Sequence, residues 1–86
     1  MTINAKRAHW ANCCIRLYDI MSRAGRGEDA IVDLLANLGH HAQTLKFDYL
    51  KLVATAIGHW HVEQTDPESI DTLPLVTITI NESKSQ

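Results

Sequence analysis

Histidine and carboxylate residues are the feature of this sequence that could carry chemistry. Five histidines occur among 86 residues, and four of them lie in the clusters "GHH" and "GHWH". Asp33 and His40 are about two helical turns apart, and His59 and Glu63 about one turn apart, so each pair shares a helix face. Imidazole and carboxylate groups are ligands that zinc, iron and manganese accept. These four residues form a candidate divalent metal site, where a bound water could be activated for hydrolysis.

The same residues have a plainer explanation as polar helix surface. Asp33 points roughly 150° away from the leucines of its helix, and His59 is about as far from Ile57. Side chains facing away from a core are usually solvated, and Asp33 or Glu63 would then only pair with a neighbouring histidine. The polar surface is therefore the leading interpretation. A metal site without any other cofactor is the alternative, and a shared dimer interface is a third.

Motifs for other catalytic chemistry are missing from the sequence. There is no glycine-rich phosphate loop, and the patterns GxSxG, HExxH and CxxC do not occur. Cys13 and Cys14 are adjacent, so on a helix they point about 100° apart and suit neither a disulfide nor a shared metal ion. His9, four residues before Cys13, is the one candidate base for a thiol nucleophile. We assign no catalytic residue.

Composition and charge indicate a small globular protein of the cytoplasm. Apolar residues make up 45% of the chain and charged residues 21%, as in ordinary globular domains. Free thiols fit a reducing compartment, and no apolar run is long enough for a signal peptide or a membrane span. The net charge is −2, but the first 27 residues are basic. Their cations, a candidate nucleic-acid surface, are Lys6, Arg7, Arg16, Arg23 and Arg26.

Apolar residues recur at helical spacing in three stretches of the chain. The first stripe consists of Trp10, Cys14, Leu17, Tyr18 and Met21. The spacing predicts helices at about 5–22, 29–43 and 48–64, a short turn at 67–71 and a tail at 82–86. Short connections favour antiparallel neighbouring helices. We expect a single, mainly α domain over residues 1–86, built as a three-helix antiparallel bundle.

The segment "LVTITIN" predicts one C-terminal β-strand at 75–81. Nearly all its residues are β-branched, and apolar side chains alternate along it. A lone strand leaves its backbone polar groups unpaired. The segment "MTIN" is too short to pair with it, whereas a second copy or the edge of an unrelated partner could do so. We expect a homodimer in which two copies of this strand form an antiparallel ribbon. The pairing residues are Leu75, Val76, Thr77, Ile78, Thr79 and Ile80.

The middle of the chain carries a recognisable pattern of residues. Its members are Asp33, Leu34, Leu35, Leu38 and His40, then Phe47 and Asp48, then His59, Trp60 and Glu63. Over about residues 8–64 the chain resembles a group of small phage- and plasmid-borne bacterial proteins, with a DLLxDLxH helix, an FD pair and a helix ending in HYxxE. Asn37 and Trp60 stand where that group has Asp and Tyr, which weakens a metal role. The resemblance implies a mobile-element accessory protein and no particular activity.

The favoured interpretation is a small binding protein rather than an enzyme. We expect a homodimer that engages a host or element-encoded protein through exposed strand edges or helix faces. One alternative is a metal-dependent or hydrolytic site on the second and third helices. The other is nucleic-acid binding through the basic first helix, although five scattered cations with few interleaved aromatic residues make nucleic acid an unlikely partner.

Overall fold

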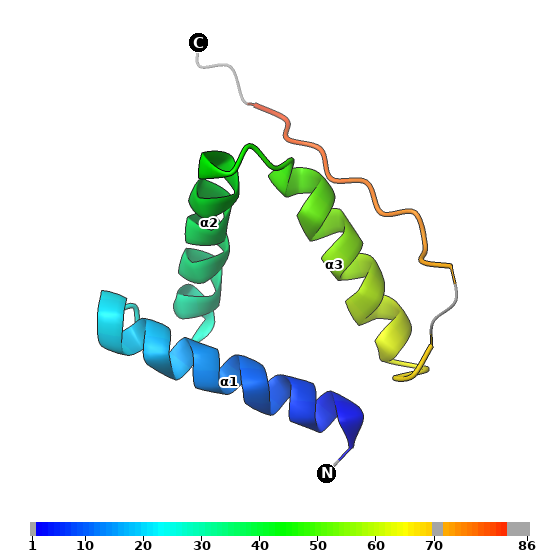
Figure 1. The fold of residues 1–86 in the computed structure, drawn as a ribbon, viewed down its shortest axis with the longest axis horizontal. Coiled ribbons are helices and arrows are strands. Elements are labelled where there is room, and N and C mark those ends of the chain that lie inside the picture. Colours follow the sequence, from blue (N-terminus) through cyan, green and yellow to red (C-terminus); the bar gives the residue numbers. More distant parts are fainter. Residues whose placement is uncertain (1, 70–71, 83–86) are drawn as a thin grey trace. The chain divides into compact units, whose positions relative to one another are not determined.

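Three helices form the secondary structure that the computed structural model shows over residues 2–69 and 72–82 (Figure 1). They are α1 (Ile3–Ser22), α2 (Glu28–Thr44) and α3 (Tyr49–Glu63). Each bound lies within two residues of the bound predicted from apolar spacing. The prediction of a mainly helical chain with three helices is therefore confirmed.

The contacts of the chain fall into two compact units. The first unit is Met1–Tyr49 and contains α1, α2 and the first residue of α3. The second unit is Leu50–Gln86 and contains the rest of α3 and the C-terminal segment. The length of the chain led us to expect one domain, and each candidate site residue belongs to one unit or the other.

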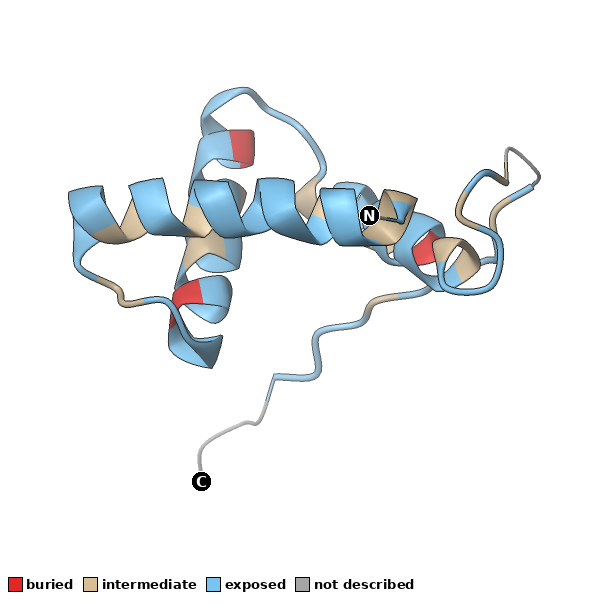
Figure 2. Ribbon diagram, turned by 90° about the horizontal axis from the view of Figure 1, so that it is seen from below, coloured by how far each residue is buried: buried red, intermediate tan, exposed pale blue. Residues whose placement is uncertain are grey.

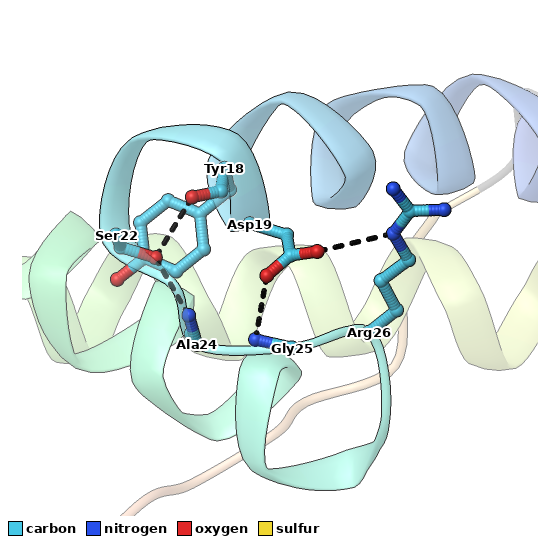
Figure 3. Close-up of polar contacts among 6 residues, drawn as sticks. All are labelled: Tyr18, Asp19, Ser22, Ala24, Gly25 and Arg26. Carbon is cyan, nitrogen blue, oxygen red and sulfur yellow. Dashed lines mark hydrogen bonds and ion pairs between the residues drawn. The ribbon is translucent and has the colours of Figure 1, made fainter.

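A cluster of polar contacts ends α1 and begins the connection to α2 (Figure 3). Arg23 takes the left-handed conformation, with φ 61°, and closes the helix. The Asp19 carboxylate accepts a hydrogen bond from Gly25 N at 2.9 Å and pairs with Arg26 Nε at 3.2 Å. Gly25 has φ 83°, a conformation that glycine adopts without strain. Two left-handed residues thus turn the chain sharply after α1.

Within the first unit, α1 and α2 cross steeply (Figures 1 and 2). The antiparallel arrangement predicted from short connections is therefore wrong for this pair, because the turn after α1 redirects the chain instead of reversing it. Ala30 is fully buried and Ala42 nearly so. Over residues 2–69 and 72–82, these two alanines are the buried apolar side chains, so little core lies between the helices.

The end of α2 is closed by a Schellman-type turn. Phe47 N donates to the Ala42 carbonyl at 3.0 Å, and Lys46 lies between them with φ 62°. Glycine is the usual residue at this left-handed position because it has no Cβ to clash with the backbone. A lysine in this left-handed conformation costs some stability, because its Cβ crowds the backbone.

Tyr49, the first residue of α3, is anchored on α2. Its hydroxyl donates to the Leu35 carbonyl. Its ring lies against Gly39, where an added Cβ would come within 2.9 Å of a ring carbon. Because Gly39 has no side chain, the Tyr49 ring can pack against α2 at this position. This packing and the bond to Leu35 fix the first residue of α3 on α2.

In the second unit, the C-terminal segment lies along α3 (Figure 1). Gly58 is buried under this segment, and a Cβ at Gly58 would be 3.6 Å from the Leu73 side chain and from the Pro74 carbonyl. Those are ordinary van der Waals distances. A single added Cβ would therefore fit between α3 and the segment.

The predicted strand is extended, but it forms no β-ladder within the described residues. Its side chains do alternate: Val76 and Ile78 are half-buried, whereas Leu75 is 95% exposed and the threonines are exposed. Ile80, expected on the inner face, is exposed. The alternation follows from extended geometry, which turns successive side chains to opposite sides.

The predicted short turn after α3 is visible in part. Ser69 N donates to the Asp66 carbonyl at 3.1 Å, and the Asp66 side chain accepts from Glu68 N at 3.3 Å. Residues 70–71 of the predicted turn and 83–86 of the predicted tail lie outside the described residues.

Candidate functional site

The four predicted metal ligands are divided between the two units. Asp33 and His40 lie on α2 in the first unit, and His59 and Glu63 lie on α3 in the second. Among the described residues, no group of three or more His, Cys, Asp or Glu side chains is placed to hold a metal ion. The metal site therefore stays a prediction.

Asp33 is used in a contact that joins α1 to α2. Tyr18 of α1 donates its hydroxyl proton to the Asp33 carboxylate and accepts a hydrogen bond from the Asn37 side chain. Asn37 also donates to Asp33 at 3.4 Å. Asp33 and Asn37 are exposed, as their distance from the leucines of α2 suggested, and they also bond to α1. We call these three residues the tyrosine clamp.

The tyrosine clamp changes the acidity of the phenol. The hydrogen bond to Asp33 raises the pKa of Tyr18 above its ordinary value, because ionisation would remove the donated proton and place two negative charges together. Desolvation adds to the increase in pKa, and the bond from Asn37 opposes it. The clamp is therefore a pH-sensitive structural contact.

The predicted nucleic-acid residues do not form one face. At about 100° per residue, Lys6, Arg7 and Arg16 point in three different directions around α1. Arg7 donates to the Asn4 side chain at 2.9 Å, and Arg26 is paired with Asp19. Two of the five cations thus have local partners, and a nucleic-acid role stays a prediction.

One thiol–imidazole contact is present on α1. The Cys13 sulfur lies 3.7 Å from His9 Nε2, and Cys13 and Cys14 are both exposed free cysteines. The spacing of four residues explains this contact without any functional requirement.

Exposed apolar side chains are the most extensive feature of the surface. On α1 they form a line of Trp10, Cys14, Leu17 and Met21, which we call the α1 stripe. Trp10 is 61% exposed, Leu17 58% and Met21 70%. The sequence marked these residues as one stripe together with Tyr18, which hydrogen-bonds to α2. The α1 stripe is left without cover in the first unit.

A second apolar surface is an open groove between α1 and α2, with a volume of about 570 Å³. Its α1 wall includes Ala8, Ala11 and Ile15, and its α2 wall includes Leu34 and Leu38. We call it the α1–α2 groove. On α1, its wall is centred roughly 120° around the helix from the α1 stripe, and Cys14 belongs to both surfaces.

A third apolar surface belongs to the second unit. Leu50, Ile57 and Trp60 are exposed and Val53 is half-buried along one face of α3. The C-terminal segment covers the neighbouring face at Gly58 instead. We call these four residues the α3 stripe.

No protein-family model, curated protein or solved structure matches this chain. In the part of the chain that the structure describes, no helix combines the length and apolarity needed to cross a membrane. Any assignment of function therefore depends on the surfaces themselves.

Proposed function

We propose that this chain is a non-enzymatic protein-interaction protein that acts as a homodimer, as an accessory protein of a mobile genetic element. The exposure of large apolar side chains carries the proposal. Soluble monomers rarely leave large contiguous apolar surfaces uncovered, and such surfaces usually mark contacts with other proteins. A host or element-encoded protein is the further partner, and the motif over residues 33–63 supports the link to mobile elements.

The C-terminal segment supplies one contact of the proposed dimer. Val76 and Ile78 are half-buried, while Leu75 and Thr77 are exposed. Where both partners are described residues, no backbone hydrogen bond joins 75–80 to another segment. An antiparallel ladder with the same segment of a second copy would satisfy these backbone groups. The half-buried residues would keep the resulting ribbon on α3, which matters because an isolated two-stranded ribbon is marginally stable.

Sedimentation velocity and amide hydrogen exchange on the full chain test this proposal. We expect a dimer at tens of micromolar, with protected amides in residues 77–80. Thr77→Pro removes one ladder N–H and should weaken the dimer and the protection, whereas Thr77→Val keeps the N–H and the β-branched shape and should preserve both. A monomer with unprotected amides at this segment would refute the ribbon.

A further inference from the structure

We propose that His9 and Cys13 of α1 form a binding site for a thiophilic divalent cation such as Zn²⁺, with the other coordination positions filled by water. The site lies within one helix of the first unit, so it does not depend on the proposed homodimer. It also uses residues different from the four metal ligands that the sequence predicted on α2 and α3.

The distance between the two side chains matches the span of a bound zinc ion. The Cys13 sulfur lies 3.7 Å from His9 Nε2. Zinc binds thiolate sulfur at about 2.3 Å and imidazole nitrogen at about 2.0–2.1 Å, so a tetrahedral angle separates the two ligand atoms by about 3.6 Å. The ion can therefore bind between these two atoms with almost no movement of either side chain.

The helix holds the two ligands together before the metal binds. α1 runs from Ile3 to Ser22, so His9 and Cys13 lie in its interior, and a spacing of four residues places them one turn apart on one face. A metal ion that bridges them ties this turn together. The unfolded chain does not hold the pair at this distance, so binding should favour the folded helix and raise its stability.

The donor atoms select the class of cation. Thiolate and imidazole suit zinc and other thiophilic ions, whereas magnesium and calcium prefer oxygen ligands. Cys13 and His9 are both exposed, so a hydrated ion reaches them directly from solvent. Binding replaces the thiol proton, which passes to the buffer, with the metal. Within the described residues no third His, Cys, Asp or Glu completes the set, and water takes the remaining positions.

The adjacent thiol is left out of this site by helix geometry. Cys14 points about 100° away from Cys13, and it lines the α1–α2 groove. The residue four positions before it is Trp10 and not a histidine. Cys14 is also a free and exposed cysteine. It is therefore a matched control, with the same thiol on the same helix but without an imidazole one turn away.

Titration of the reduced full chain with Co²⁺ tests this site, because a cobalt–thiolate bond absorbs strongly in the near ultraviolet and cobalt bound to histidine or carboxylate does not. We expect this absorption for the native chain, its loss when Zn²⁺ displaces the cobalt, and a higher melting temperature with Zn²⁺. Cys14→Ser should retain all three effects. His9→Gln and Cys13→Ser should lose them over the same concentration range, and circular dichroism checks that each variant is as helical as the native chain.

Three results would overturn the inference. The native chain could show no cobalt–thiolate absorption at all. The absorption could persist in Cys13→Ser or disappear in Cys14→Ser, which would place the metal on the other thiol. It could also be unchanged in His9→Gln, which would mean that a thiol binds cobalt without the imidazole. None of these results bears on the proposed homodimer, whose ribbon is tested separately by sedimentation and hydrogen exchange.

Discussion

Replacement of Leu17 by glutamine gives a quantitative test of the α1 stripe as a contact of the proposed homodimer. Full burial of a leucine side chain stabilises by about 1.5–3 kcal/mol. Leu17 is 58% exposed, so its burial in the dimer would gain about 0.9–1.7 kcal/mol per chain and about twice that per dimer. At about 1.4 kcal/mol per tenfold change, Leu17→Gln should raise the dimer Kd about 20- to 250-fold. Glutamine is close to leucine in helix propensity, so α1 itself should persist.

The neighbouring residue provides the matched control. Arg16 is exposed and points about 100° away from Leu17 on the same helix. Arg16→Gln introduces the same side chain off the stripe and should change the Kd less than about fivefold, as expected for a surface substitution within about ±0.5 kcal/mol per chain. Sedimentation equilibrium gives both constants. Equal losses in the two variants, or an unchanged Kd for Leu17→Gln with normal helicity, would refute the reasoning.

Three further predictions concern the tyrosine clamp and the turns. Because the pKa of Tyr18 is raised in the folded state, the clamp should stabilise fully below pH about 10 and lose its effect as pH rises through the raised value. Urea unfolding of Tyr18→Phe should lack this alkaline loss, and the same loss in the variant would exclude the clamp as its source. Gly58→Ala should stabilise α3 by roughly 0.5–1 kcal/mol, because the added Cβ fits. Gly58→Leu should instead displace the C-terminal segment and lower the melting temperature, and an unchanged melting temperature would contradict the observed packing. Lys46→Gly should raise the melting temperature by relieving the left-handed lysine, whereas a lower value would show that the turn carries no strain.

The helices could be predicted from the sequence because their signals are local. Apolar spacing and the glycines after Ser22 placed the ends of α1 and α2 within two residues. The alternation in the C-terminal segment correctly separated Val76 and Ile78 from Leu75. These patterns depend only on the geometry of one helix or one extended chain.

The partners of each helix face could not be predicted in the same way. Spacing groups Trp10, Leu17 and Tyr18 on one stripe, but it does not say that Tyr18 would hydrogen-bond to α2. It likewise groups Asp33 with Asn37 and leaves open which helix lies opposite them. That choice depends on the turn after α1, where the left-handed Arg23 carries no sequence signal as clear as a glycine.

The scarcity of buried side chains links the folding of this protein to its abundance. In the described residues, Ala30 and Ala42 are the buried apolar side chains, so each unit taken by itself draws little folding free energy from its own interior. In the homodimer that we propose, binding of a second copy to the folded form would add stability by mass action, and the melting temperature would rise with protein concentration. Gene dosage would thereby control the fraction of folded molecules as well as their number. A few copies per cell would leave the chain vulnerable to proteases, and strong expression would protect it.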